Sequence, residues 1–454
     1  MRIVTCSNSS ARVSEVDGAP DLVPVGPGGV VPMVAALLRR FGGDWFSIGD
    51  HRPASVTIDG VTTRLHPVRL DPATAEAHHG RIAIQVLQWI FHYLHETSAS
   101  PLFDRGTWTA WRAYAEVNAM VAGRMAAAAR DDGQRVWLVN DHQFLLVPEH
   151  LRAAVPAAHL VYFHQLPWCQ ADYFGMLPRP VRDAILRNLL ACDVVGFHAR
   201  RWADAFLDCC ARFLPGVDVR GDRVTTAAGS VRVVVAPGPV DESALARVAA
   251  DRRTDRWRET LSRQLDGRRL LVRAERFDLW KNVRRGLLAY EELLARRPEV
   301  ADEVWFCALL SPPRRATARH RAERAACEAV ADRVNARRRR AVTLLYPRPG
   351  DNGPHRVAAA LGLAAATLVN PTFDGLNLVA MESLLLAPRT PVILSRNAGA
   401  YEFLGRHTAT VDPFDVTGTA DAIGAALDGP PPQPVAAHVA NPTRDAETWL
   451  AALR

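Results

Sequence analysis

The chain has 454 residues, and 48% of them are hydrophobic, which is enough for two or three domains with a sizeable core in each. Its 55 basic and 48 acidic residues are interleaved, so the net charge of +7 favours anionic small molecules as ligands over nucleic acid. No secretion signal opens the sequence and no apolar run approaches the length of a membrane span. We therefore expect a soluble protein of the cytoplasm that binds neither membranes nor nucleic acid.

Runs rich in β-branched residues alternate with amphipathic stretches along the whole chain. The expected strands are Arg2–Cys6, Val136–Val139, Leu160–His164, Val194–Phe197, Leu270–Arg273, Val304–Leu309, Val342–Leu345, Thr367–Asn370 and Pro391–Leu394. The expected helices include Pro32–Arg40, Pro180–Ala191, Arg201–Phe213, Val283–Arg296, His355–Leu363 and Arg444–Leu453. This alternation predicts an α/β protein whose parallel sheets are covered by helices on both faces.

Two proline-rich segments divide the sequence. Pro237, Gly238 and Pro239 interrupt any regular element, so we expect an N-terminal domain over residues 1–237 and a second domain over residues 238–429. Residues 430–454 are expected to form a stiff connector and a terminal helix that packs back on the N-terminal domain. Both halves are expected to be doubly wound, with ligands in a central cleft at the carboxyl ends of the strands.

Lys281 is the only lysine in the chain, since the other 54 of the 55 Lys and Arg positions hold arginine. Together with Arg276 it follows the expected strand Leu270–Arg273. Two cations at the end of a strand can clamp a diphosphate and neutralise the charge that grows on it as a leaving group. Arginine is no equivalent substitute for a compact ammonium. The alternative is a surface Arg and Lys beside Asp278.

The segment from Asp374 to Glu382 follows the expected strand Thr367–Asn370 and opens a helix. Gly375 lies in the strand-to-helix turn, and the backbone N–H groups of Asn377–Val379 would point at an anion such as a diphosphate. Glu382 lies one to two turns further on, where its carboxylate could accept hydrogen bonds from a ribose diol. The alternative is an ordinary capped helix with Glu382 facing solvent.

Polar residues also follow two expected strands of the N-terminal half. Asp141 comes shortly after Val136–Val139, and His164 ends the next strand, so both are expected at the rim of the cleft, where they could bind sugar hydroxyls. A His–Asp pair could instead belong to a hydrolase, but no Gly-x-Ser-x-Gly elbow supplies a nucleophile. Gly29 belongs to a glycine-rich loop that is only a weak phosphate-loop signal.

Neither a metal site nor a disulfide framework is indicated. The seven cysteines are scattered without a C-x-x-C pair, and no clustered His or Asp residues have the spacing of metal ligands. The adjacent Cys209 and Cys210 suit small buried hydrophobic residues better than a cross-link.

These motifs, in this order, resemble the trehalose-6-phosphate synthases and their actinobacterial relatives, glycosyltransferase family 20. The resemblance covers nearly the whole chain, from Cys6–Asn8 to Asp412–Asp415. It implies a GT-B fold and a retaining transfer that uses no metal or other cofactor. The donor would be a UDP- or GDP-linked sugar or cyclitol, and the acceptor a sugar, amino sugar or cyclitol with or without a phosphate. A homo-oligomer is compatible with the sequence.

The resemblance also assigns roles to individual residues. Arg276 and Lys281 would hold the donor diphosphate, and Glu382 would bind the ribose. Asp374 and His164 would face the donor ring, Asp141 would lie at the acceptor, and Asp141, His164, Arg276 and Lys281 would form the catalytic set. The donor would be bound by Gly29, Arg276, Lys281, Asp374, Gly375, Asn377, Leu378, Val379 and Glu382.

The acceptor side departs from the family pattern. Where the synthases read Ser-Asn-Arg near the first strand, this chain ends the triplet with Ser9, and where they carry a tyrosine nine residues before Trp89, it has Gly80. In the family both lost groups help to hold the phosphate of glucose 6-phosphate, so that acceptor would be severely weakened. The acceptor contacts expected in this chain are Ser9, Trp45, Trp89, Asp141 and Arg314.

We therefore expect a transferase that forms a trehalose-like linkage to an acceptor that need not be glucose 6-phosphate, in natural-product biosynthesis such as that of an antibiotic. A second reading is a pseudo-glycosyltransferase that couples a nucleotide-activated cyclitol to an aminocyclitol phosphate through nitrogen. The segment Pro167–Tyr173 is similar to that branch, whereas Leu376–Val379 is closer to true sugar transferases. A third reading is an inactive sugar-phosphate sensor, against which the intact Arg276 and Lys281 argue.

Overall fold

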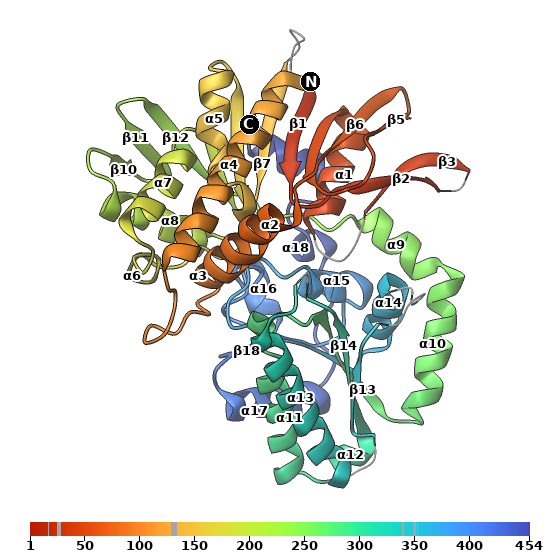
Figure 1. Ribbon diagram of the computed structural model, residues 1–454. Helices are drawn as coiled ribbons and strands as arrows, with labels where there is room; N and C mark the ends of the chain where they lie inside the picture. Colours follow the sequence, from red (N-terminus) through yellow and green to blue (C-terminus); the bar gives the residue numbers. More distant parts are fainter. Residues whose placement is uncertain are drawn as a thin grey trace. The chain divides into compact units, whose positions relative to one another are not determined.

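The computed structural model describes residues 1–16, 18–24, 29–128, 134–313, 315–337, 340–347, 351 and 353–454. The chain forms two compact units, of which the first comprises Met1–Gly238 with Ala446–Arg454 and the second comprises Pro239–Asp445 (Figure 1). The segment 430–454 is therefore divided, because residues 430–445 belong to the second unit and the last nine to the first.

The first unit is built on a ten-stranded sheet in the order β10-β11-β12-β9-β8-β7-β1-β4-β6-β5. Its strands are β1 (Arg2–Ser7), β4 (Gly43–Ile48), β5 (Ala54–Ile58), β6 (Val61–Val68), β7 (Arg135–Asn140), β8 (His159–His164), β9 (Val194–Phe197), β10 (Asp218–Arg220), β11 (Arg223–Thr226) and β12 (Gly229–Val235). Neighbours from β12 to β6 pair in parallel, and the edge strands β5, β10 and β11 pair antiparallel.

Several helices and a separate hairpin complete this unit. The hairpin is β2 (Ala11–Val16) with β3 (Ala19–Pro24). The helices are α1 (Val30–Phe41), α2 (Pro72–Ala75), the π-helix η1 (Glu76–Gln88), α3 (Trp89–Phe91), α4 (Arg105–Ala128), the 3-10 turn η2 (His142–Phe144), α5 (Val147–Ala154), α6 (Ala171–Phe174), α7 (Arg179–Leu189), α8 (Arg200–Phe213) and α19 (Ala446–Ala452).

The terminal helix α19 packs into the first unit through Trp449. This indole is fully buried, donates its N–H to the carbonyl of Ala236 at 3.2 Å, and meets Phe163 edge-on with 4.7 Å between ring centroids. Arg40 of α1 pairs with Glu447 at 3.1 Å. The last helix is therefore part of the same core as α1 and the central strands.

The second unit has a six-stranded, wholly parallel sheet in the order β15-β14-β13-β16-β17-β18. Its strands are β13 (Arg269–Arg276), β14 (Val304–Ser311), β15 (Val342–Leu345), β16 (Ala366–Val369), β17 (Val392–Ser395) and β18 (Ala409–Val411). The helices are α9 (Glu242–Ala250), α10 (Arg252–Leu265), η3 (Leu279–Lys281), α11 (Val283–Arg296), α12 (Val300–Glu303), α13 (Ala318–Arg337), α14 (Gly353–Leu363), α15 (Leu378–Leu386), α16 (Tyr401–Leu404), η4 (Gly405–His407), α17 (Val416–Asp428) and α18 (Ala437–Ala440).

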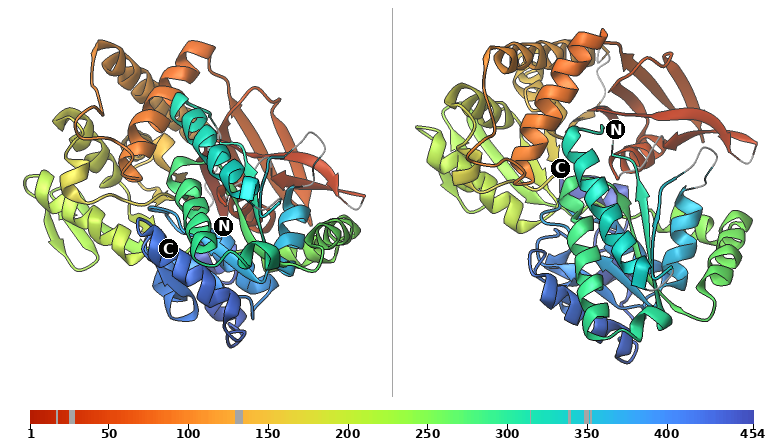
Figure 2. Two further views of the ribbon diagram at one scale, coloured as in Figure 1. Left: turned by 90° about the horizontal axis from the view of Figure 1, so that it is seen from below. Right: turned by 60° about the horizontal axis from the view of Figure 1, so that its bottom comes forward.

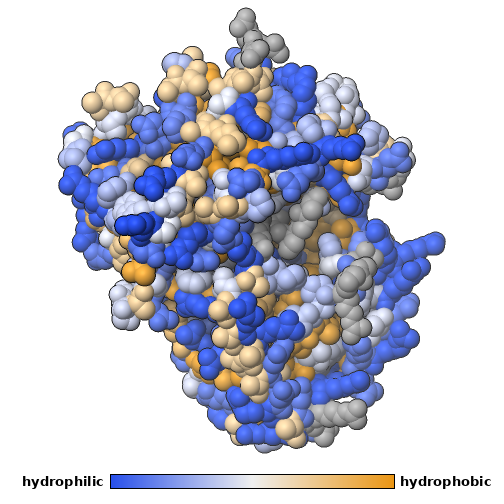
Figure 3. Space-filling model, viewed as in Figure 1, coloured by the Kyte–Doolittle hydropathy of each residue, from blue (hydrophilic) through white to orange (hydrophobic). Residues whose placement is uncertain are grey.

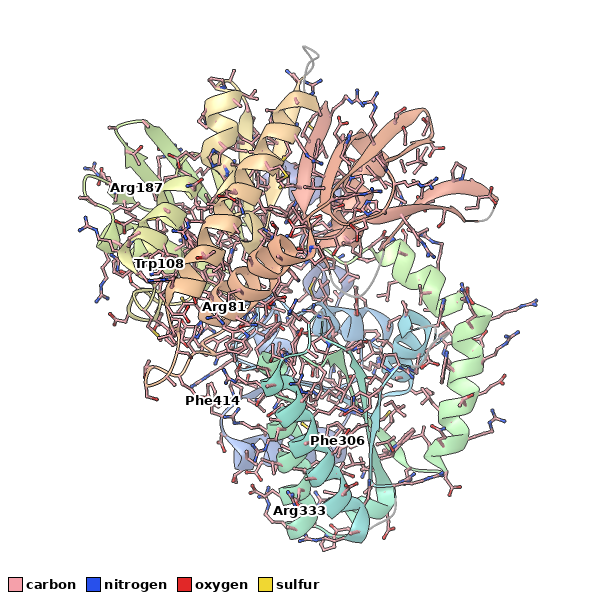
Figure 4. The ribbon with its side chains drawn as sticks, viewed as in Figure 1. Arg81, Trp108, Arg187, Phe306, Arg333 and Phe414 are labelled. Atoms are coloured by element: carbon pink, nitrogen blue, oxygen red, sulfur yellow. The ribbon has the colours of Figure 1, made fainter. Side chains whose placement is uncertain are left out.

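Helices cover both faces of this second sheet (Figures 1 and 2). Alternate residues of the central strands enter different cores: Leu271 and Phe306 pack with α11 and α13, whereas Leu270 and Trp305 pack with α10 and α14. Figure 4 shows Phe306 inside the unit, and Arg333 on the outer side of α13. The predicted parallel sheet covered on both faces is confirmed.

The strand order fixes where ligands bind in such sheets. Numbered along the chain, the six strands of the second unit lie in the order 3-2-1-4-5-6, so the connections reverse direction between β13 and β16. The parallel strands β1, β4, β6, β7, β8 and β9 of the first unit have the same order, with the reversal between β1 and β7. Ligands of doubly wound sheets bind beyond the carboxyl ends of the strands at this point.

No helix in the described ranges is long and apolar enough to cross a membrane. On the face shown in Figure 3, hydrophilic side chains predominate and apolar ones are scattered between them. All seven cysteines are free and buried, as expected for small apolar side chains.

Candidate active site

The two charged motifs of the second unit meet at its reversal point. Arg276 ends β13 and Lys281 ends η3, which follows directly, while Asp374 lies between β16 and α15. Lys281 Nζ lies 2.5 Å from Asp374 Oδ2, and the two side chains are only 12% and 13% exposed. Asn377 Nδ2 donates to the same carboxylate oxygen at 3.0 Å. The sequence segments around residues 281 and 374 thus form one largely shielded polar cluster.

Arg276 is paired as well, but with its neighbour in sequence. Its Nη2 lies 2.7 Å from Asp278 Oδ2, and the Arg276 side chain is half-buried whereas Asp278 is buried. Both predicted clamp cations therefore have a carboxylate partner. Because neither is a fully exposed side chain, the interpretation of Arg276 and Lys281 as ordinary surface cations does not fit their surroundings.

The turn into α15 is shaped by Asn377 and by close packing at Gly375. Asn377 caps the helix with a positive φ of 79°, and its Oδ1 accepts the N–H of Ala380 at 3.3 Å. The N–H groups of residues 378 and 379 come before the first intrahelical hydrogen bond and are suited to an anion. A Cβ on Gly399 would lie 2.0 Å from the carbonyl oxygen of Gly375, so these two loops can approach only because residue 399 is glycine.

Glu382 is half-buried on α15. The described part of the chain makes no ion pair or hydrogen bond with its carboxyl group. Burial raises the pKa of Glu382 to about 7. Among the described residues, the half-buried carboxyl group of Glu382 therefore has no ion-pair or hydrogen-bond partner, which differs from a fully exposed carboxylate on an ordinary capped helix.

Two charged residues of this cluster were not identified from the sequence. Arg273 and Glu275 project from β13, are buried, and form an ion pair with each other. Burial raises the pKa of the Glu275 carboxyl, while the charges of Arg273 and Lys281 oppose this rise. The sequence could have indicated them, because two charged residues are unusual in a buried parallel strand, where near-continuous apolar runs are the norm.

In the first unit, Asp141 lies at the reversal point between β1 and β7. It follows β7 with a positive φ of 72°, and its Oδ1 lies 3.1 Å from His142 Nδ1 and 3.4 Å from the backbone N of Gln165. Burial would raise the pKa of this carboxyl, but the neighbouring His142 outweighs burial and holds the pKa well below its usual range. Asp141 is therefore a buried, ionised carboxylate, and His142 is a second partner that the sequence did not single out.

His164 lies deeper than the sequence predicted. It was expected at the rim of a cleft, but it is fully buried, with Nδ1 3.0 Å from the Tyr162 hydroxyl and Nε2 3.3 Å from the Pro167 carbonyl. The rings of Phe91 and Trp168 lie edge-on at 4.5 and 5.0 Å. Burial lowers the pKa of His164 to about 3, so the ring is neutral. No part of its side chain is exposed in this structure.

Trp45 is likewise a core residue. It is fully buried on β4, and its indole N–H donates to Ser7 Oγ at 2.8 Å, while that hydroxyl donates to the Ser9 carbonyl at 2.6 Å. The expected contact of its ring with an acceptor is not available in this arrangement, because the packed core surrounds it. Trp45 instead holds the turn that carries Ser9, which is half-buried.

The wide winding of helix η1 places Gly80 and Trp89 on the same side of the helix. Its C-terminal hydrogen bond runs from the N–H of Trp89 to the carbonyl of Ile84, which is the wide spacing of a π-helix. Nine residues cover about 2.5 turns of an α-helix but only about two turns of this wider winding. The Glu76 carboxylate lies over Gly80, because a Cβ on Gly80 would be 2.6 Å from either of its oxygens.

Two expected site residues have little or no described environment. Gly29 precedes α1 and its carbonyl accepts the N–H of Met33 at 3.2 Å, whereas the rest of its loop, Gly26–Gly28, lies outside the described residues. Arg314 also lies outside them. In the part of the chain that is described, no group of three or more His, Cys, Asp or Glu side chains is placed to hold a metal ion.

Comparison with known proteins decides the family. The sequence pattern of glycosyltransferase family 20 matches residues 26–438. The chain belongs to glycosyltransferase family 20. It is 30% identical over 461 residues to validamine 7-phosphate valienyltransferase of Streptomyces hygroscopicus subsp. jinggangensis, covering 95% of this chain and 88% of that protein. It is also 30% identical over 428 residues to trehalose-6-phosphate synthase of Mycobacterium bovis, covering 88% of this chain and 82% of that enzyme.

Solved structures of the family agree with the fold. The trehalose 6-phosphate synthase of Burkholderia multivorans superimposes with a TM-score of 0.84 at 25% identity, over 100% of this chain and 98% of that one. The enzyme of Burkholderia xenovorans, solved in complex with glucose-6-phosphate, gives 0.82 at 23% identity over 100% and 96%. This family member is therefore a GT-B glycosyltransferase similar to the trehalose-phosphate synthases.

Proposed function

We propose that this enzyme transfers a glycosyl group, with retention and without a metal, from a nucleoside diphosphate donor to a sugar-like acceptor. The observation that carries the proposal is the placement of Arg276, Lys281 and Asp374 together with the start of α15 at the reversal point of the second sheet. Two cations and a helix N-terminus at the carboxyl ends of parallel strands suit a diphosphate. Glu382, half-buried and without a partner among the described residues, would accept hydrogen bonds from the donor ribose.

The proposed reaction takes place on one face of the donor ring. The bond between the anomeric carbon and the diphosphate oxygen breaks, and its electron pair stays on the leaving phosphate. The acceptor hydroxyl bonds to the same face of that carbon and gives its proton to the leaving phosphate oxygen, so the configuration is retained. Arg276 and Lys281 stabilise the charge that develops on the diphosphate, which is the electrostatic task a metal performs in other transferases. No protein nucleophile takes part.

Donor binding would rearrange the pairs seen in the cluster. Lys281 is held by Asp374 and Arg276 by Asp278, so a diphosphate must share or replace these carboxylates. Asp374 would then be available to the hydroxyls of the donor ring, as the family resemblance implies. The ammonium of Lys281 is compact enough to serve both a carboxylate and a phosphate oxygen.

For the acceptor, we infer a group without a phosphate at the position that the family uses for one. Ser9 carries no charge, and at Gly80 the space next to the backbone is filled by the Glu76 carboxylate. A carboxylate repels a phosphate and attracts an ammonium or accepts from hydroxyls. Ionised Asp141, at the reversal point of the first unit, would orient the acceptor hydroxyls. Unphosphorylated sugars and amino sugars are therefore the favoured acceptors.

A second candidate function is the coupling of a nucleotide-activated cyclitol to an amine through a C–N bond. It is favoured by the 30% identity to a protein named validamine 7-phosphate valienyltransferase. Tyr173, from the segment similar to that branch, packs against Tyr93 with 4.8 Å between ring centroids. In this reaction an amine nitrogen of the acceptor, rather than a hydroxyl oxygen, would form the new bond.

The proposal is tested by mixing the purified enzyme with UDP-glucose or GDP-glucose and, in turn, glucose 6-phosphate, glucose and glucosamine. We expect nucleoside diphosphate release that depends on an unphosphorylated acceptor, an α-configured product by NMR, and unchanged rates in EDTA. A β-configured product or loss of activity in EDTA would overturn the retaining, metal-independent mechanism. Turnover only with an activated cyclitol and an amine would establish the second candidate.

A double variant tests the inference about the acceptor. In the double substitution Ser9→Arg and Gly80→Tyr, the new side chain at residue 80 displaces the flexible Glu76 carboxylate and restores a hydroxyl. The rate with glucose 6-phosphate relative to glucose should then rise. Gly123→Ala, on α4 with nothing within 4 Å of its Cβ, is the matched control. An unchanged acceptor preference in the double variant would contradict the inference.

A further inference from the structure

Arg273 is an unusual residue for its place in the second unit. It lies on β13, the strand between β14 and β16, and its side chain is fully buried. A guanidinium taken out of water needs compensating partners. Its Nε donates to the buried carboxylate of Glu275, which lies two residues on and on the same face of the strand.

The remaining donors of Arg273 reach the backbone that carries Lys281. Nη2 donates to the carbonyl of Lys281, and Nη1 donates to the carbonyl of Asn282 at 3.3 Å. Asn282 itself has a positive φ of 61°, and its Nδ2 donates to the carbonyls of Asn370 at 2.9 Å and Pro413 at 2.7 Å. The turn between η3 and α11 is thus held from two sides, by Arg273 and by Asn282.

Gly286 makes room for this guanidinium. A Cβ on residue 286 would lie 2.3 Å from Arg273 Nη1 and 3.1 Å from Leu368. Gly286 lies inside α11, where glycine is less favourable than alanine, and its φ is not in the positive range that requires glycine. The space that Arg273 occupies accounts for a glycine at this position.

We propose that Arg273, seated over Gly286, is a positioning residue that fixes the backbone of Lys281 so that its ammonium stays beside Asp374. The effect of Arg273 on turnover rests on the proposed function. Its effect on the position of Lys281 does not rest on that function, because the pairing of Lys281 with Asp374 can be measured without any donor. Arg273 would act only through Lys281, since its own donors are directed at Glu275 and at main-chain oxygens.

The test uses two variants and one matched control. Arg273→Met with Glu275→Gln removes both buried charges together, so that no unpaired charge hinders folding. Gly286→Ala keeps the guanidinium but forces it to shift. The control is Gly362→Ala on α14, where a Cβ meets nothing within 4 Å. Because Lys281 is the only lysine, modification of its ε-amine by an amine-reactive reagent can be followed by peptide mass spectrometry, separately from the N-terminal amine.

We expect Lys281 to be modified faster in both variants than in the wild type and the control, and kcat per folded molecule to fall by about 10²-fold because the cation is misplaced. Lowered unfolding midpoints with unchanged modification rates and unchanged kcat would overturn the proposal and leave Arg273 a purely structural role. If the wild type shows no turnover with any donor, the proposed function fails, while the modification rates still decide whether Arg273 positions Lys281.

Discussion

Replacement of Glu382 by glutamine tests whether the half-buried carboxyl group opposes folding when it is ionised. The wild-type pKa is about 7 in the folded protein, against an ordinary value of 4.5. Below pH 4.5 both states hold the proton, so the group has no effect on stability. Between pH 4.5 and 7 only the unfolded state releases the proton, and stability falls as pH rises, reaching its full loss above pH 7.

The size of this effect follows from the difference between the two pKa values. At about 1.4 kcal/mol for each pH unit, the difference corresponds to about 3 kcal/mol, and solvent reaching the half-buried side chain reduces it to about 1–3 kcal/mol. Glu382→Gln should therefore be more stable than the wild type at pH 8.5, with a smaller gain at pH 4.5. Urea unfolding at the two pH values measures it, with Glu328→Gln, an exposed partner of Arg324, as the control.

The same group should affect donor binding. An ionised Glu382 accepts hydrogen bonds from a ribose diol more strongly than a neutral amide does, so the affinity for UDP-glucose or GDP-glucose should rise between pH 6 and 8 in the wild type. In Glu382→Gln this rise should be absent. A stability difference between the two proteins that is the same at pH 4.5 and 8.5 would show that ionisation of the half-buried carboxyl group does not oppose folding.

Three further substitutions test other parts of the account. Lys281→Ala should fold, as judged by circular dichroism, but lose turnover by about 10²–10³-fold or more, because half of the diphosphate clamp is gone; near-wild-type turnover would remove that assignment. Asp141 has a depressed pKa and so stabilises the fold above the ordinary range of a carboxyl group, a contribution lost as pH falls through its folded value. In acid titrations, the stability of Asp141→Asn should therefore change less with falling pH than that of the wild type. The variant should also lose acceptor-dependent turnover. Trp45→Phe loses one buried hydrogen bond to Ser7 and leaves a cavity in the core, so it should cost about 1–3 kcal/mol of stability in urea unfolding while keeping kcat.

The central strands could be predicted because burial on both faces leaves its mark on the sequence. The segment Val304–Leu309 is continuously apolar and forms most of β14. The strand β4 could not be predicted in this way, since it contains Asp44, whose partner His66 lies 2.8 Å away on β6 and is known only from the fold. The π-helical winding of η1 is likewise set by tertiary packing, as in the bond from His78 to the Gln143 carbonyl at 3.1 Å.

In the candidate site, the rule that ligands bind at strand ends correctly predicted that Lys281 and Asp374 lie close together. Both residues follow strands that border the reversal point. The same rule misplaced His164, since the aromatic rings that bury it come from Phe91 and Trp168, which the strand pattern does not connect with it. Arg273 was missed because a charge inside a strand has meaning only once its carbonyl partners are known.

The most direct test of the central claim is nucleoside diphosphate release by the purified enzyme with UDP-glucose and GDP-glucose, with and without each acceptor. We predict release that requires an acceptor and is stronger with glucose or glucosamine than with glucose 6-phosphate. Efficient formation of trehalose 6-phosphate would contradict the role given to Ser9, Gly80 and Glu76. Tight donor binding without turnover under any acceptor would contradict catalysis itself and indicate a sugar-phosphate sensor.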